Sequence, residues 1–328
     1  MKKITLIEIA KLADVSQPTV SAILSNNKNN NTKFSKITAK KVRKIADDYN
    51  YRPSRTLRTL FEKKHNSIGL LAKNINMIPH DSMNSVINNA SKNNQTVLID
   101  TFKENDELPN TIREDIVDGL LIFEDLGKMI DAAIDKYEIP AVYVNANKYD
   151  CNALTVNIDE KEAMHQAADL FSTSNKKRTL LLLQGDSSYT QLRAAGIKEA
   201  CITNEPVILI ITENSTYKDS YKKTVFQKIK SILINNPDID SIISGWDITS
   251  NVVYEVCQSM NKRIPEDIAV LSLYDVSGHW QLYPEITSLY VDYSEMANKG
   301  LELLNKKINK LKCSDIILKY KLMEGESV

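Results

Sequence analysis

Glycine is scarce in this sequence: only nine occur among 328 residues. Neither G-x-G-x-x-G nor G-x-x-x-x-G-K-[ST] is present, which excludes the glycine-rich loops that cradle phosphates in nucleotide-binding enzymes. The four histidines are scattered, and H-E-x-x-H and G-x-S-x-G are also missing. The sequence therefore gives no indication of a catalytic centre, and we expect a protein that is not an enzyme.

Cysteine is sparse as well. Cys151, Cys201, Cys257 and Cys313 lie far apart and form no C-x₂-C pair, which argues against both a zinc ribbon and a disulfide framework. We expect free thiols, no bound metal and no cofactor.

Long apolar runs are missing too. No segment approaches the roughly 18 consecutive apolar residues of a membrane span. Near the N-terminus, Glu8, Lys11 and Asp14 interrupt the apolar stretch that a secretory signal needs. We therefore expect a cytoplasmic protein.

Charge is balanced in total but not along the chain. Lys+Arg and Asp+Glu each number 42, yet residues 1–64 contain 15 basic and 5 acidic residues, which leaves 27 and 37 for residues 65–328. A basic head on an acidic body is typical of a nucleic-acid-binding domain joined to one that need not touch phosphate. The alternative is a solvated, lysine-rich surface.

Residues 5–24 predict two short amphipathic helices joined by a tight turn. Asp14 lies in the turn, and aspartate tolerates the left-handed backbone region better than most residues. Ser16 is a good N-cap, and Pro18 falls in the first turn of the second helix, where its missing N–H costs little. The expected apolar stripes are Ile4, Ile7, Ala10 and Leu12 in the first helix and Val15, Val20, Ile23 and Leu24 in the second.

A short helix, a tight turn and a Ser/Thr-rich second helix is the plan of a helix-turn-helix, whose second helix enters the major groove and reads bases with its N-terminal residues. Gln17 can pair bidentately with adenine, and Thr19 can bond a phosphate or a base. The alternative is an ordinary small helical bundle. The candidate DNA contacts here are Ser16, Gln17, Pro18, Thr19, Ser21 and Ala22.

Residues 26–61 are predicted to form a loop and two further helices after the helix-turn-helix. Residues 26–34 are polar and asparagine-rich, which predicts a loop. Ser35 is expected to cap a third helix that runs to about Asn50 and ends before Pro53. A further short helix is predicted over residues 55–61. The inward-facing residues of the third helix are expected to be Val42, Ile45 and Ala46.

From Ile68 onwards, apolar β-rich runs alternate with helix-like stretches. Continuous apolar strands separated by helices predict parallel sheets covered on both faces, and about ten strands suit two α/β lobes better than one. The predicted strands lie at residues 67–73, 96–102, 119–125, 141–147, 154–159, 179–185, 207–213, 241–247, 268–275 and 288–293.

Taken together, these motifs resemble the LacI/GalR family of repressors along the whole chain. The opening TLIEIAKLADVSQPTVSAIL, at residues 5–24, follows the family pattern T-[LI]-x-[ED]-[IV]-A-x-x-A-G-V-S-x-x-T-V-S. After it come the family's S-x-x-T-x-x-x-V, its Y-x-P and its SIGLL entry to the sensor domain. These later motifs fall on Ser35, Thr38 and Val42, on Tyr51 and Pro53, and on residues 67–71.

The resemblance implies a hinge helix that orders on DNA. In the family, hinge helices of two subunits pair in the minor groove, and a leucine from each wedges into the central base step. Leu60 matches that leucine, with a leucine packed on the head as the alternative. A seven-residue helix is unstable alone, so docking should order it. The other DNA contacts implied by position are Thr5, Tyr51, Ser54, Arg55 and Arg58.

Three departures from the family pattern put the operator sequence in doubt. Asp14 replaces the usual glycine of the turn, Ala22 stands where many members carry arginine, and the 26–34 loop is longer than usual.

The resemblance also implies a two-lobed sensor like the periplasmic sugar-binding proteins, with effector contacts at strand ends facing the cleft. Arg193 matches the arginine that usually grips the ligand, although it could instead pair with an acidic neighbour. Asp275 matches a cleft aspartate or caps the following helix, and Trp246 either stacks on a sugar ring or fills the cleft. The remaining candidates are Asn74, Asn145 and Asp247.

The expected organisation is a helix-turn-helix domain over 1–53, a hinge helix and linker over 54–66, and a sensor over 67–328. Its N-lobe would comprise about 67–158 and 291–318, and its C-lobe about 159–290 and 319–328. We expect a regulator, usually a repressor, that binds double-stranded DNA at a near-palindromic operator as a homodimer and responds to a sugar or related metabolite. The sequence ends at Val328 without a leucine-heptad tail, so dimers are expected rather than tetramers. A solute-binding protein would share the sensor fold but not the basic head.

Overall fold

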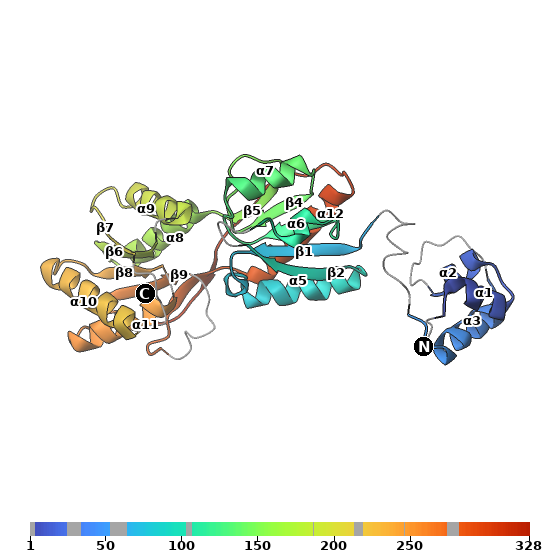
Figure 1. Cartoon of the computed structure of the whole chain (residues 1–328). Helices are drawn as coiled ribbons and strands as arrows, with labels where there is room; N and C mark the ends of the chain where they lie inside the picture. The colour runs from blue at the N-terminus through green and yellow to red at the C-terminus, as the bar shows by residue number, and fades with distance from the viewer. Residues whose placement is uncertain are drawn as a thin grey trace. The chain divides into compact units, whose positions relative to one another are not determined.

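The computed structural model describes residues 4–24, 34–52, 64–102, 107–185, 187–212, 219–245, 247–273 and 282–328. The chain divides into two compact units, Met1–His65 and Asn66–Val328 (Figure 1). Below, they are called the head and the sensor. No helix within the described ranges is long and apolar enough to cross a membrane.

The head contains three helices, α1 (Leu6–Ala13), α2 (Gln17–Leu24) and α3 (Lys36–Asp48). Ser35 caps α3, and its side chain accepts a hydrogen bond from the backbone N–H of Thr38 at 3.0 Å. Val42 and Ala46 are buried, and Ile45 packs against the same core. The prediction for the third helix and its inward face is therefore confirmed.

The predicted apolar stripe of the first helix is wrong. Ile7 and Leu12 are 54% and 49% exposed, whereas Ile9, Ala10 and Ala13 are buried. Ile9 and Ala13 are four residues apart, so they lie one above the other on the same helix face, and this face packs against α2 and α3. In the second helix, Val20 and Ile23 are buried as predicted.

The sensor contains two six-stranded sheets, in which every neighbouring pair of strands is parallel except β10 and β12. The first has the order β11-β5-β4-β3-β1-β2, and the second β12-β10-β9-β8-β6-β7. The strands of the first sheet are β1 (Ser67–Ala72), β2 (Thr96–Thr101), β3 (Gly119–Ile122), β4 (Ala141–Val144), β5 (Leu154–Ile158) and β11 (Ile316–Leu318). Those of the second are β6 (Thr179–Gln184), β7 (Val207–Ile211), β8 (Ser241–Ser244), β9 (Ala269–Leu273), β10 (Thr287–Tyr290) and β12 (Lys321–Met323).

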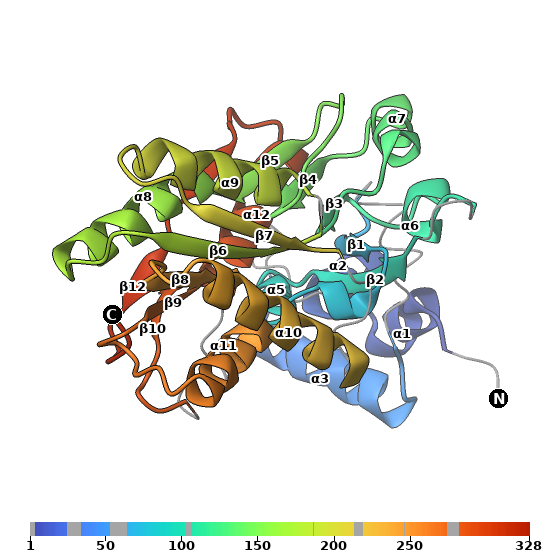
Figure 2. The same ribbon diagram turned by 90° about the vertical axis from the view of Figure 1, so that its left-hand side faces the viewer.

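Helices cover both faces of each sheet. Figure 2 shows α8 and α9 on one face of the second sheet and α10 and α11 on the other. The first sheet is accompanied by η1 (Ile75–Met77), α5 (His80–Lys92), α6 (Asn110–Arg113), α7 (Lys128–Lys136) and α12 (Tyr293–Ile308). The second has α8 (Glu160–Thr173), α9 (Ser188–Ala200), α10 (Asp219–Asn235) and α11 (Asp247–Ser259).

The continuous apolar strands are explained by these two helical layers. In β6, Leu181 and Leu183 belong to the core shared with α8 and α9, whereas Leu180 and Leu182 belong to the core shared with α10 and α11. Alternate side chains of a strand point to opposite faces, so a strand covered on both faces is apolar along most of its length. The ten predicted strands are present; β11 and β12, each of three residues, were not predicted.

The chain passes between the two sheets three times: from β5 to α8, from β10 to α12 and from β11 to β12. The first and third of these crossovers lie side by side, because the N–H of Asp159 donates to the carbonyl of Leu318 at 2.9 Å. Lys321, in the third crossover region, forms ion pairs with Asp292 and Glu295, which follow the second.

Candidate functional site

The start of α1 is fixed by a reciprocal pair of hydrogen bonds. The N–H of Thr5 donates to the Glu8 carboxylate at 2.7 Å, and the N–H of Glu8 donates to Thr5 Oγ1 at 3.3 Å. This is a capping box, which satisfies backbone donors that have no partner within the helix. Thr5, a candidate DNA contact, is exposed and also serves as the helix cap.

The turn between α1 and α2 depends on Asp14. Its backbone is in the left-handed region, with φ 56° and ψ 50°, as the sequence predicted. The N–H groups of Asp14 and Val15 donate to the carbonyls of Lys11 and Ala10, at 3.3 and 3.1 Å. These bonds end α1 and reverse the chain into α2 within three residues.

The N-terminus of α2 carries the residues predicted to read DNA. Ser16 Oγ accepts a hydrogen bond from the N–H of Thr19 at 3.3 Å and lies 2.8 Å from Thr19 Oγ1, so Ser16 caps this helix as predicted. Ser16, Gln17, Pro18 and Ser21 are exposed, and Thr19 is half-buried. Together they form a polar, accessible surface on one end of α2.

The remaining candidate DNA contacts of the head are less accessible or lie outside the described residues. Ala22 is only 5% exposed, so it offers little surface to a ligand. Tyr51 is half-buried and packs against the head core. The hinge candidates Ser54, Arg55, Arg58 and Leu60 lie outside the described residues.

In the sensor, Asn74 and Asn145 each follow a strand of the first sheet. Asn74 caps η1, and its side chain accepts from the N–H of Asn76 at 3.0 Å. Asn145 has a left-handed backbone, with φ 50°, and its carbonyl accepts a hydrogen bond from the Tyr189 hydroxyl of α9. Among the described residues, its buried side-chain Oδ1 has no hydrogen-bond partner.

Two acidic residues after β3 shape the same edge of the first sheet. Glu124 accepts from the N–H of Lys73 at 2.6 Å and from that of Asn74 at 3.4 Å. Asp125 accepts from the N–H of Asn147 at 2.5 Å. Burial raises the pKa of Asp125, while the hydrogen bond from Asn147 and the charge of Lys73 act in the opposite direction.

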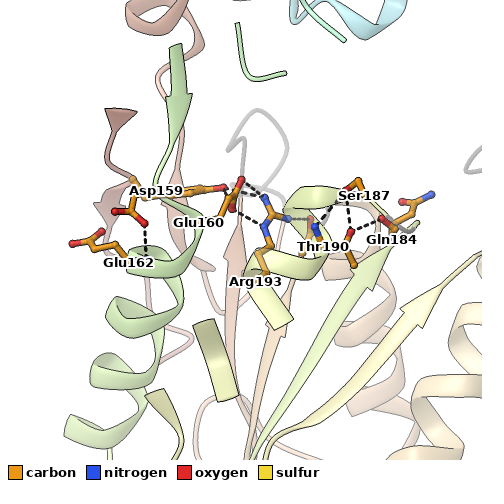
Figure 3. Close-up of polar contacts among 9 residues, drawn as sticks. Asp159, Glu160, Glu162, Gln184, Ser187, Thr190 and Arg193 are labelled. Atoms are coloured by element: carbon orange, nitrogen blue, oxygen red, sulfur yellow. Dashed lines mark hydrogen bonds and ion pairs between the residues drawn. The ribbon is translucent and has the colours of Figure 1, made fainter. Parts of the chain in front are cut away.

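Arg193 lies on α9 and is buried in an ion pair. Its Nε lies 2.7 Å from one carboxylate oxygen of Glu160, and its Nη2 lies 3.1 Å from the other (Figure 3). Nη2 also donates to the Tyr320 hydroxyl at 3.0 Å, and Nη1 lies 3.5 Å from the carbonyl of Gly245. The side chains of Arg193 and Glu160 are 6% and 1% exposed. The acidic neighbour that the sequence left open as an alternative is Glu160.

Two of the predicted sensor residues, Asn145 and Arg193, come together at α9. Arg193 is part of this helix and binds Glu160. Tyr189, one helical turn before Arg193, donates to the carbonyl of Asn145. Asn147 also donates to Ser188 Oγ at the start of α9. Trp246 and Asp275 lie outside the described residues, and Asp247 is the first residue of α11.

Glu160, Tyr320 and Tyr189 were not predicted. Glu160 directly follows the predicted strand over 154–159, a position where polar residues often line a cleft, and that was the available signal. Nothing in the sequence pairs residue 160 with residues 193 and 320. Gln184 ends β6, but its carboxamide points away from the Arg193 cluster (Figure 3).

Comparison with known proteins matches both units. Residues 5–54 match the family described as bacterial regulatory proteins, lacI family, and residues 169–328 match the periplasmic binding protein-like domain. Catabolite control protein A of Staphylococcus epidermidis is 23% identical, with 97% of each chain covered. That of Streptococcus mutans is 24% identical, with 98% of this chain and 97% of the relative covered.

Solved structures share the fold over the full chain. The Lac repressor dimer bound to operator and the anti-inducer ONPF has a TM-score of 0.79 at 17% identity, with 99% of each chain covered. The transcriptional regulator CelR in complex with cellobiose has a TM-score of 0.65 at 19% identity, with 99% of this chain and 100% of that chain covered. With its helix-turn-helix head, two-sheet sensor and relatives that match from end to end, the chain belongs to the LacI/GalR family of transcription regulators.

Proposed function

We propose that this protein is a sequence-specific DNA-binding repressor that acts as a homodimer and is controlled by a sugar or related metabolite bound in the sensor. It acts by binding and not by catalysis. The observation that carries the proposal is the head: a left-handed turn at Asp14 presents the capped, exposed N-terminus of α2. Such a helix end, carried by a basic head, fits the major groove.

Within this proposal, Gln17 and Thr19 contact base edges, while Thr5, Ser16, Pro18, Ser21 and Tyr51 position the head on the DNA backbone. Ala22 is a buried residue of α2 and contributes little surface to the DNA contact. Ser54, Arg55 and Arg58 belong to the hinge, where they contact the backbone beside the minor groove. Leu60 wedges into the central base step. A dimer presents two such heads, so the operator consists of two related half-sites.

The effector part of the proposal rests on the sensor fold and on the residues at its strand ends. Lac repressor has been solved bound to ONPG and CelR in complex with cellobiose, and we extend a sugar-like ligand to this chain. Asn74, Asn145, Arg193, Trp246, Asp247 and Asp275 are the residues proposed to surround it. Effector binding would change the relation between the lobes and thereby DNA affinity, with a coupling typically of about 1–3 kcal/mol.

Selection from random double-stranded DNA, followed by titration of the selected site, tests this function. We expect enrichment of a near-palindrome and a loss of affinity for it when Gln17 is replaced by alanine. Lys28→Ala, in the head but outside α2, is the matched control and should leave sequence preference unchanged. Equal binding to all sequences would contradict the proposal. Repeating the titration with lactose, cellobiose and their monosaccharides tests the effector part separately.

A further inference from the structure

The guanidinium of Arg193 is held in place by groups of the protein itself. Four of its five N–H groups point to protein acceptors: two to the Glu160 carboxylate, one to the Tyr320 hydroxyl and one to the Gly245 carbonyl. The Tyr320 hydroxyl in turn donates to Glu160 Oε2 at 3.0 Å. The three side chains therefore form a closed, buried triangle.

The triangle has no net charge. Arg193 contributes one positive charge and Glu160 one negative charge, and both side chains are almost completely buried. Removing ions from water is costly unless they are paired, so a buried arginine without Glu160 would attract an anion strongly. With Glu160 in bidentate contact, a phosphate or carboxylate arriving at Arg193 would meet a carboxylate at hydrogen-bond distance from the same guanidinium.

The opposite lobe gives a second observation. Asn145 lies close to α9, since its carbonyl accepts from Tyr189, and its buried Oδ1 receives no hydrogen bond from the part of the chain that the structure describes. An unpaired buried acceptor is satisfied by a ligand that brings an O–H or N–H group. At the same edge of the sheet, the carboxylates of Glu124 and Asp125 outnumber the ammonium of Lys73, which disfavours an anion.

We propose that Glu160 is a positioning residue that determines the class of effector: by neutralising Arg193, it makes the sensor select an uncharged, hydroxyl-bearing ligand and reject phosphorylated or carboxylated ones. This inference rests on the proposed function, because it assumes that the sensor binds an effector. The Tyr320 hydroxyl bonds both Arg193 and Glu160 and so fixes their relative position without changing the net charge of the pair.

The experiment compares full-length wild type with three variants by thermal unfolding in potassium phosphate and in potassium chloride at equal ionic strength. Glu160→Gln keeps the shape of the side chain and removes its charge. Tyr320→Phe is the matched control, since it removes both hydrogen bonds of the Tyr320 hydroxyl and leaves the charge balance intact. Glu160→Gln combined with Arg193→Gln removes both charges.

We expect Glu160→Gln to gain phosphate-specific stabilisation, with an apparent affinity for inorganic phosphate at least roughly tenfold above that of wild type. Wild type, Tyr320→Phe and the double variant should show only the general stabilisation that phosphate gives to folded proteins, of the same size in all three. A purely structural Glu160 would lower the unfolding temperature equally in both salts, so the difference between salts separates the two roles.

Three results would overturn the proposal: a phosphate effect in Glu160→Gln no larger than in wild type, an equal excess in Tyr320→Phe, or an excess that persists in the double variant. Should Glu160→Gln not fold, hydrogen exchange of the α9 amides in wild type decides: protection by phosphate beyond that by chloride would overturn the proposal, and equal exchange would support it. Because the experiment needs neither operator nor natural effector, its failure leaves DNA binding untouched. Failure of the proposed function would instead appear as an absence of sequence-selective DNA binding.

Discussion

The head and the sensor differ in the sequence separation of the contacts that form their candidate sites. In the head, Thr5 pairs with Glu8 and Ser16 with Thr19, in both cases three residues apart. In the sensor, Arg193 pairs with residues 33 and 127 positions away. A site built from local contacts can be recognised in a diverged sequence as a short motif. A site built from distant contacts changes its hydrogen-bond partners when one residue elsewhere in the chain is replaced.

The largest expected effect concerns the distant contacts. Arg193→Met leaves the Glu160 carboxylate buried without its cation, and we expect the sensor to lose about 3–5 kcal/mol of unfolding free energy. Urea unfolding followed by circular dichroism measures this loss. Arg263→Met, which removes an exposed arginine paired with Asp267, is the matched control and should change the unfolding free energy very little. Equal losses in both variants would show that the buried Arg193–Glu160 pair contributes no more to stability than an exposed pair.

The next effect concerns the hinge. Leu60→Ala removes the apolar wedge, and we expect specific DNA binding to weaken by about 2–3 kcal/mol, because burial of a leucine side chain contributes an energy of this size and offsets the cost of unstacking the base step. Binding to non-operator DNA should change much less. Footprinting on operator and non-operator DNA measures both, with Leu57→Ala in the same segment as the control. A similar loss on both kinds of DNA would contradict the wedge role.

A smaller effect tests the turn of the head. Asp14→Val places a β-branched residue at φ 56°, and we expect α1 and α2 to lose about 1–2 kcal/mol of stability because this side chain disfavours the left-handed region. Asp14→Gly should instead be neutral or stabilising by up to about 1 kcal/mol. Hydrogen exchange of the amides of α1 and α2 in the full chain reports both. An unchanged exchange rate in Asp14→Val would show that the turn is not strained by side-chain branching.

The smallest effect tests the cap of α2. Ser16→Ala removes the acceptor of the Thr19 N–H, and we expect a loss of about 1 kcal/mol in helix stability. Ser16→Asp should retain the cap but place a negative charge at the surface proposed to meet phosphate, so DNA affinity should fall while α2 stays protected from exchange. If Ser16→Asp bound DNA as well as wild type, α2 would not be the element that enters the groove.

Much of the fold could be predicted because it is encoded in short-range patterns. The left-handed turn at Asp14, the caps at Ser16 and Ser35 and the ten apolar strands all follow from residues within a few positions of one another. The stripe assigned to the first helix was wrong, because Ile9 and Ala13, and not Ile7 and Leu12, face the other two helices. Periodicity alone does not say which face meets a partner.

By itself, the sequence determined the class of this protein, its basic head and the alternation of strands and helices, since these depend on composition and local spacing. Only the tertiary structure decided what surrounds Arg193. The first and third crossovers bring Glu160 and Tyr320 into contact with Arg193 of α9, although these residues lie far apart in the sequence. No short sequence pattern indicates this contact. The strands β11 and β12 were missed for the same reason: three-residue strands are stabilised by neighbours that lie far away in the sequence.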